Sequence, residues 1–392
     1  MQPRRPSWVI RVLFTVTWTA VLMALAVAAF EAYWRRFGFD PNAYYTWPPG
    51  FHMVFKADPQ AMPGVAGPAD FLINGLGLRG DVPGLRQRRY LAIGGSTTED
   101  AFLKLENSWT YQLQRRMAGS WVGNMGKAGT NSRHHALAAE RILPRLPNID
   151  VVIVLVGLND MLFDLGLHHP PNLGPEWDLG QTFAYRPAEN AALLDRFAVY
   201  HLGVNTWRNW QVSPEAVRTV DGSFFGDYKR RRTRVHPEDW VDVLPAMMPF
   251  LGKYRQNLMR IMLAAQGAQV VFVTQPSLWT SRPTAEQLTQ MYMGGFGSPD
   301  VWRDPHNKWM TPQAMLRALT AYNQETLDFC ADRHLSCIDL ASELPKQATF
   351  FYDDAHFSDA GAAAVATILA RHLSRDVSGG YQHTSMNVHR GE

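Results

Sequence analysis

Ser96 stands where a buried strand would end, a position suited to a nucleophile. The apolar run at residues 90–93 is followed by the turn Gly94-Gly95-Ser96 and by two threonines. In open α/β sheets, ligands bind in the crevice beyond the carboxyl ends of the strands, so a hydroxyl at this place can reach a bound substrate. The same letters also fit an ordinary Gly-Ser turn, which is common in proteins.

Three further polar segments follow other apolar runs. Residues 124–132 form a turn with spaced glycines, which leaves backbone N–H groups free to point at an anion. Asn159 follows the run at residues 151–156 and either donates a hydrogen bond to a developing oxyanion or caps a helix. Asp353 precedes His356 by three positions, a spacing that lets the carboxylate orient the imidazole and stabilise its cation. Each of the four segments is weak evidence for a catalytic site by itself, but their order along the chain strengthens the prediction.

An alternation of apolar runs and helical patterns predicts the scaffold that positions these residues. The apolar runs predict strands at residues 90–93, 121–124, 151–156, 270–274 and 336–340. Helical patterns lie at residues 109–117, 134–143, 251–265, 312–334 and 359–373. Ser358 is a candidate N-cap for the last helix. Such alternation is typical of βαβ units, so the sequence predicts an α/β fold with a five-stranded parallel sheet.

Two regions interrupt the alternation. Residues 40–84, rich in Pro, Gly and aromatic residues, indicate a linker and a short-stranded lead-in. Residues 163–239 are too long for a βα loop and predict an insertion on the rim of the site, either a lid or substrate platform or a surface elaboration. Its basic run at 229–234 either binds anionic groups or, as is commoner, forms a solvated face. Residues 291–309 follow a strand and are a second irregular piece that can line the same crevice.

The N-terminus carries an uncharged apolar segment at residues 12–30, close to the length that spans a bilayer. Arginines precede it, which by the positive-inside rule places the N-terminus in the cytoplasm. A cleaved signal peptide with Ala26-Val27-Ala28 as its cleavage site is the alternative, and a buried soluble helix is a third. The apolar segment is long for a signal peptide, which favours an uncleaved anchor in residues 1–39. Both leading interpretations export the remainder of the chain.

Composition narrows the function classes. With 392 residues, 46% of them hydrophobic, the chain can bury a sizeable core. Its 38 basic and 35 acidic residues nearly balance, which predicts no nucleic-acid partner. Cys330 and Cys337 are too few for a disulfide scaffold or a zinc site. They either pair with each other in an oxidising compartment or remain free core thiols.

The sequence also lacks the HExxH and paired-cysteine patterns of metal sites. The scattered histidines are therefore interpreted as surface or loop residues rather than ligands: His134, His135, His168 and His169. We expect no metal and no cofactor.

Taken together, the blocks GGS, Gly129, GLND and DDAH closely resemble the SGNH hydrolases, also called the GDSL family of esterases and lipases. The resemblance extends over about residues 74–373, and the lead-in NGLGLRG at 74–80 is similar to one seen in bacterial members. It implies a three-layer α/β/α sandwich of the flavodoxin-like type for residues 85–375, followed by a polar tail at 376–392. One departure is Gly95, which stands where the family's name motif has aspartate. The Gly-x-Ser-x-Gly elbow of other α/β hydrolases is absent.

The resemblance implies a role for each block. Three residues match the catalytic triad: Ser96 as nucleophile, His356 as base and Asp353 as orienting carboxylate. Three groups match the oxyanion donors: the backbone N–H groups of Ser96 and Gly129 and the side chain of Asn159. Gly126 is an alternative to Gly129 because both lie in the same turn, and Asp354 is expected to matter less than Asp353.

The implied activity is ester hydrolysis through an acyl-enzyme. For an exported enzyme anchored in the cytoplasmic membrane, we expect the substrate to be an O-acyl (acetyl) ester of a cell-envelope carbohydrate, that is, an acylated glycan. Acyl transfer to an exopolysaccharide and hydrolysis of lipid esters are the alternatives. A non-catalytic subunit of a membrane complex is the alternative of another class, and the intact set of Ser, Gly, Asn, Asp and His counts against it.

Overall fold

The chain folds into two units in the computed structural model. One unit comprises Met1–Tyr44 and Asn172–Ala216, and the other comprises Tyr45–Pro171 and Val217–Glu392. The structure describes residues 8–37, 47, 49–146, 148–167, 193–194, 197–200, 202–203, 217–265, 267–296 and 307–378. Most of the predicted insertion, His168 and His169, and the tail beyond residue 378 lie outside the described residues.

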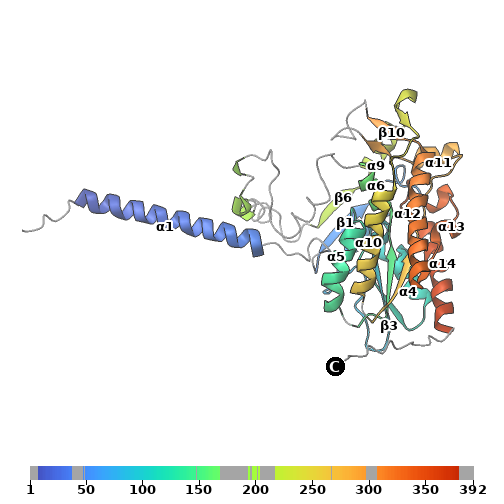
Figure 1. Cartoon of the computed structure of the whole chain (residues 1–392), viewed down its shortest axis with the longest axis horizontal. Helices are drawn as coiled ribbons and strands as arrows, with labels where there is room; N and C mark the ends of the chain where they lie inside the picture. Colours follow the sequence, from blue (N-terminus) through green and yellow to red (C-terminus); the bar gives the residue numbers. More distant parts are fainter. Residues whose placement is uncertain are drawn as a thin grey trace, which may run out of the picture. The chain divides into compact units, whose positions relative to one another are not determined.

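The first unit contains the long helix α1 (Trp8–Phe37), drawn in blue in Figure 1. Within the described part of the chain, it supplies the one helix long and apolar enough to cross a membrane, over Trp8–Arg35 with a mean hydropathy of 2.2. Its length and composition fit a membrane anchor and also a signal sequence. Near its end, Glu31 pairs with Arg35.

The second unit is built on a parallel sheet of five strands, as the sequence predicts. The strands are β3 (Arg88–Gly94), β4 (Ser120–Asn124), β5 (Val151–Leu155), β8 (Gln269–Val273) and β11 (Ser336–Ile338). They lie in the order β11-β8-β5-β3-β4. Numbered along the chain this is 2-1-3-4-5, the flavodoxin-like order, in which the direction of winding reverses between β3 and β5. Ligands bind at such a reversal, so the carboxyl ends of β3 and β5 are the expected place for a site.

Two groups of helices accompany the sheet. Their main members are α4 (Trp109–Arg116), α5 (Ser132–Ile142), α10 (Met248–Ala264), α12 (Pro312–Arg333) and α14 (Asp359–Ser378). Helix α10 packs against both α5 and α12, whereas α4 packs against α14 (Figure 1). Right-handed crossovers place the helices on opposite faces of a sheet whose strand order reverses, which yields the three-layer α/β/α sandwich. Ser358 caps α14 as predicted, because its hydroxyl accepts the N–H of Gly361 at 3.1 Å.

Two small sheets and several short helices were not predicted individually. One sheet joins β1 (His52–Lys56), β2 (Pro68–Leu72) and β6 (Arg218–Asp221), and the other joins β7 (Trp240–Val241), β9 (Gly295–Phe296) and β10 (Lys308–Met310). The short helices are α3 (Ser96–Glu99), α6 (Leu158–Asp164), α9 (Phe224–Arg232), α11 (Ala285–Gln290) and α13 (Leu340–Glu343). The strands β1 and β2 agree with the predicted short-stranded lead-in.

The basic run on α9 differs from the predicted solvated face. Lys229 is buried, and its ammonium donates to the backbone carbonyls of Ala61 and Tyr352 at 2.6 and 2.5 Å. Arg232 is also buried and lies over the ring of Trp240. Two of the four cationic residues of α9, Lys229 and Arg232, are therefore buried, and backbone carbonyls and an aromatic ring replace water around them.

Cys330 and Cys337 form a disulfide, which settles the alternative left open by the sequence. The bond ties the end of α12 to β11, the edge strand of the main sheet.

Candidate active site

Ser96 follows β3 and opens the short helix α3, with Gly95 as its N-cap residue. The turn is tightly packed: a Cβ at Gly94 would lie 2.1 Å from Thr98 Oγ1, and a Cβ at Gly95 would lie 2.6 Å from Asn159 Nδ2. The two glycines therefore allow the β3 turn to close against α3 and against the segment that follows β5.

Ser96, His356 and Asp353 form a continuous hydrogen-bonded series. The distance from Ser96 Oγ to His356 Nε2 is 2.7 Å, and that from His356 Nδ1 to Asp353 Oδ2 is also 2.7 Å. The other carboxylate oxygen of Asp353 accepts the backbone N–H groups of Ala355 and His356. With the Nδ1 proton directed at the carboxylate, Nε2 is left to accept the serine proton.

The electrostatics of this series favour a charged pair. Burial alone would lower the pKa of His356, but the carboxylates of Asp353, Asp100 and Asp354 raise it above its usual value. Burial likewise opposes ionisation of Asp353, and the imidazole with the two backbone N–H groups nevertheless keeps the pKa of Asp353 below its usual value. The imidazolium that forms when Ser96 loses its proton is thus stabilised by a carboxylate that stays ionised.

The two predicted oxyanion donors beyond Ser96 lie beside it. Asn159 lies in the first turn of α6, whose N-cap is Gly157, so Asn159 does not cap the helix. Its side-chain amide donates one hydrogen to the carbonyl of Thr130 at 2.7 Å, which leaves a second hydrogen for a ligand. Gly129 has φ of +73° and lines the same pocket as Ser96 and Asn159.

Gly126 is placed differently from Gly129. Its N–H donates to Asn124 Oδ1 at 2.8 Å, and a Cβ there would lie 2.2 Å from the backbone nitrogen of Glu99. Gly126 therefore packs the turn against α3, and Gly129 is the glycine that faces the pocket.

The pocket at Ser96 and His356 has a volume of about 220 Å³. Its remaining walls are largely apolar and comprise Leu158, Leu162, Phe163, Leu167, Phe224, Phe225, Tyr228, Tyr292 and Met293. Phe224, Phe225 and Tyr228 come from α9, within the segment predicted to be a rim insertion. Tyr292 and Met293 belong to the irregular piece predicted to line the same crevice, and their place in the pocket confirms that prediction. A few polar groups thus share the pocket with largely apolar walls, as is usual for small-molecule sites.

Arg79 contributes to the site through the helix that carries Ser96. This role was not predicted from its segment NGLGLRG. The guanidinium is buried and donates to the carbonyls of Glu99 and Asp100 at 2.7 Å and of Leu103 at 2.5 Å. Burial lowers the pKa of Arg79 to about 10, opposed by the nearby carboxylates of Asp100 and Glu99. Arg79 thereby binds the carbonyls at the end of the helix that carries Ser96.

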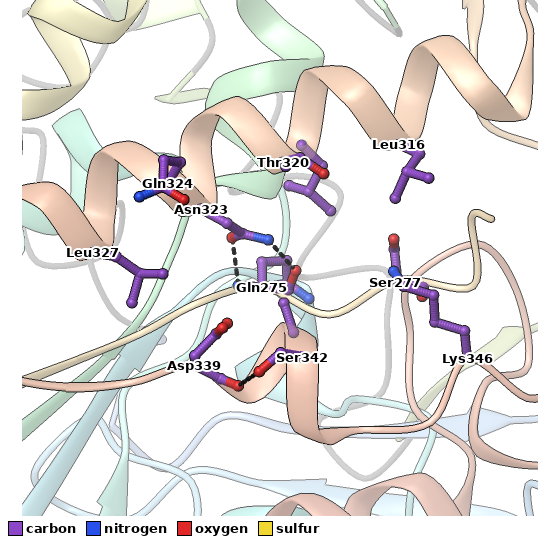
Figure 2. A pocket seen from close by; sticks show the side chains of 12 residues that line it. Gln275, Ser277, Leu316, Thr320, Asn323, Gln324, Leu327, Asp339, Ser342 and Lys346 are labelled. Atoms are coloured by element: carbon purple, nitrogen blue, oxygen red, sulfur yellow. Dashed lines mark hydrogen bonds between the residues drawn. The ribbon is translucent and has the colours of Figure 1, made fainter. Parts of the chain in front are cut away.

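A second pocket, of about 200 Å³, lies beyond the ends of β8 and β11. Figure 2 shows Asn323 bonded to the backbone of Gln275, whose N–H and carbonyl it engages at 2.8 and 2.9 Å. The amide oxygen of Gln275 in turn accepts the hydroxyl of Thr97 at 3.0 Å. Asn323, Gln275 and Thr97 thus form a hydrogen-bonded brace between α12 and the turn that carries Ser96.

The interpretation of His134 and His135 as surface or loop residues is wrong. Both are buried on α5. His134 Nδ1 accepts the N–H of Asn131 in a capping box, and His135 Nε2 lies 3.1 Å from Thr130 Oγ1. Burial, with His134 nearby, lowers the pKa of His135 to about 3, so it stays neutral. Local sequence patterns missed this because burial is set by the helix that packs on α5.

This chain is similar to known lipases and acylhydrolases. Residues 92–364 match the GDSL-like lipase/acylhydrolase family model. A lipolytic protein of the G-D-S-L family from Veillonella parvula is similar in structure, with a TM-score of 0.40, 10% identity and coverage of 73% of this chain and 98% of that one. An aryl esterase of M. smegmatis has a TM-score of 0.39, 12% identity and coverage of 74% and 99%. A carbohydrate acetylesterase from Sinorhizobium meliloti has a TM-score of 0.37, 11% identity and coverage of 74% and 99%. No curated protein matches the sequence significantly.

Proposed function

The chain belongs to the GDSL-like lipase/acylhydrolase family and is an ester-bond hydrolase, and we propose that Ser96, His356 and Asp353 are its catalytic triad. The observation that carries the proposal is the pair of 2.7 Å hydrogen bonds that join the three side chains. A hydroxyl bonded to an imidazole that is itself held by a carboxylate is the arrangement that activates serine for acyl transfer.

Acylation begins when the Ser96 hydroxyl gives its proton to His356 Nε2 and Ser96 Oγ bonds to the ester carbonyl carbon. The negative charge on the carbonyl oxygen is met by the backbone N–H groups of Ser96 and Gly129 and by the Asn159 amide. When the intermediate collapses, the bond to the alcohol oxygen breaks and His356 protonates the departing alcohol. The acyl group is then esterified to Ser96.

Deacylation repeats these steps with water. His356 takes a proton from the water as its oxygen attacks the acyl carbon, and Ser96 recovers that proton as the acid leaves. A sugar hydroxyl in place of water would turn the same step into acyl transfer.

We further propose that the enzyme is exported and acts on O-acyl esters, including acetyl esters, of a cell-envelope carbohydrate. Helix α1 supports a single-pass anchor in the cytoplasmic membrane, with the catalytic unit on its outer side. The disulfide Cys330–Cys337 supports an oxidising compartment such as the periplasm or the exterior. The apolar pocket walls favour a second candidate, esters of longer acyl chains such as those of lipids.

A fluorophosphonate probe tests the proposal. The full chain in detergent is expected to be labelled and to hydrolyse p-nitrophenyl esters, whereas Ser96→Ala should lose labelling and at least about a thousandfold in rate. Ser342→Ala, which removes a serine of helix α13 outside the pocket at Ser96, is the matched control and should keep both. A wild-type chain that takes no label and cleaves neither acetate nor longer esters would favour a non-catalytic subunit. Acetate release from an acetylated polysaccharide would favour the carbohydrate over the lipid substrate.

A further inference from the structure

Asp354, the second aspartate of the DDAH block, has its carboxylate engaged away from the imidazole. Trp279 Nε1 donates to Asp354 Oδ1 at 2.8 Å, and the backbone N–H groups of Tyr292 and Met293 donate to Asp354 Oδ2 at 2.6 and 2.9 Å. The backbone carbonyl of Asp354 also accepts the N–H of Leu278 at 2.7 Å. One fully buried residue therefore joins the segment that carries His356 to two other segments of the chain.

Two of these segments, those of His356 and of Tyr292 and Met293, contribute to the pocket at Ser96. Tyr292 and Met293 line the pocket beside His356. The ring of Tyr292 contacts those of Phe225 and Tyr228, with centroids 5.5 and 5.6 Å apart, so the wall continues into the aromatic face of α9. The backbone at Tyr292 and Met293 is not in a helix or strand, so its position depends on bonds such as those from Asp354.

The negative charge of Asp354 is compensated by Arg232 of α9, the helix that also supplies Phe225 and Tyr228. Burial and the neighbouring Asp353 raise the pKa of Asp354, and Arg232 on α9 and the two backbone N–H groups oppose this rise. Arg232 is buried as well, so the cation and the carboxylate compensate each other inside the protein.

We propose that Asp354 is a positioning residue that determines which acyl groups the enzyme accepts, by fixing the Tyr292–Met293 wall of the acyl pocket. The proposal rests on the proposed function, since it assumes that esters bind at Ser96. The two adjacent aspartates then have separate tasks: Asp353 orients the base, and Asp354 shapes the pocket for the acyl chain.

The test compares esters of increasing acyl length. The full-length wild type and Asp354→Asn are assayed with p-nitrophenyl acetate, butyrate and octanoate, and the labelling rate with a small fluorophosphonate is measured in parallel. An amide cannot accept from all three donors at once, so the wall should loosen. The ratio of kcat/KM between the best ester and the poorest is expected to fall on the order of tenfold, the effect of a methylene-sized change in an apolar pocket. The labelling rate should stay within about threefold of wild type.

Two further variants keep the result interpretable. Trp279→Phe removes one donor to Asp354 while retaining an aromatic ring, and a smaller shift of the ratio in the same direction is expected. If Asp354→Asn does not fold, Trp279→Phe provides the test of the proposal. Asp339→Asn removes a strand-end carboxylate that accepts a hydroxyl from Thr274 outside the pocket, and the ratio should not change.

An unchanged ratio in a folded Asp354→Asn, or a uniform loss across all esters together with lost labelling, would overturn the proposal. The proposed function fails separately, and only if the wild type itself is neither labelled nor active.

Discussion

At the scale of single residues, the environment of His356 is the feature with the most direct chemical consequence. Its ring lies parallel to that of Tyr352, with centroids 5.5 Å apart and an angle of 7° between the planes. Asp353 bonds it directly, and Asp100 and Asp354 add negative charge nearby. The imidazole is thus confined in orientation and biased towards its cationic form.

This bias sets the pH dependence of catalysis. A general base must be neutral to take the proton of Ser96, so kcat/KM should rise as the pH increases through the pKa of His356. Because the surrounding carboxylates raise that pKa above its usual 6.5, the acid limb should lie above pH 6.5. The measurement is a pH profile of ester hydrolysis under kcat/KM conditions.

Asp100→Asn is the companion variant. Burial raises the pKa of Asp100 to about 7, and its carboxylate raises the pKa of His356, so the variant should shift the acid limb to lower pH. An asparagine oxygen can still accept the N–H of Trp109, as Asp100 does at 3.1 Å. A wild-type limb at or below pH 6.5 would contradict the prediction.

The meeting of Ser96, His356 and Asp353 could be predicted because their blocks, in this order along the chain, resemble those of the SGNH hydrolases. The hydrogen bonds of Asp354 could not be predicted in this way. Its partners, Trp279 and the Tyr292–Met293 backbone, are distant in sequence, so nothing in the letters around residue 354 indicates them.

At the scale of elements, α3 depends on a residue outside the main sheet. A helix of four residues leaves its carbonyls without helical partners, and Arg79 binds those of Glu99 and Asp100 together with that of Leu103. The αL conformation of Asp100, with φ of +51°, ends the helix at the same place. The lead-in segment therefore holds the turn that presents Ser96.

Arg79→Met should consequently destabilise the protein. It leaves the buried carbonyls of Glu99 and Leu103 without the arginine donor, while the carbonyl of Asp100 keeps the N–H of Leu103 at 2.9 Å. The loss is expected to cost about 2 kcal/mol or more of unfolding free energy, measured by denaturant unfolding. Arg79→Lys should recover only part of this, since one ammonium cannot match the geometry of a guanidinium. Arg86→Met, at an exposed arginine just after the lead-in, is the control and should have little effect. Equal stabilities for the Arg79 and Arg86 variants would contradict this account.

The regular elements were largely predictable, and the small sheets were not. Strand β5 is a continuous apolar run, and α12 has both an N-cap threonine and a proline at its first turn, which are local signals. Strand β1 pairs with β6, from Met53 with Arg218 to Lys56 with Asp221, and no local pattern specifies a partner so far along the chain. Likewise, the basic run of α9 predicts a solvated face, because the residues that bury Lys229 are distant from it in sequence.

At the scale of the whole molecule, α1 and the disulfide both bear on where the enzyme acts. If α1 is an uncleaved anchor, an N-terminal epitope and the catalytic activity should fractionate together with the cytoplasmic membrane. Added protease should reach the catalytic unit only from the outer side. A soluble exported form that lacks about the first 28 residues would show instead that α1 is a cleaved signal peptide. A cytosolic enzyme with protonated thiols at Cys330 and Cys337 would contradict export altogether.

The pairing of β1 with both β2 and β6 also limits how the enzyme can be shortened. In that sheet β1 is the central strand, so a fragment beginning at residue 85 would lose two of three strands and leave β6 without a neighbour. It would also lose Arg79. A soluble fragment suited to crystallisation should therefore start before His52, close to the end of α1, and not at the first strand of the main sheet.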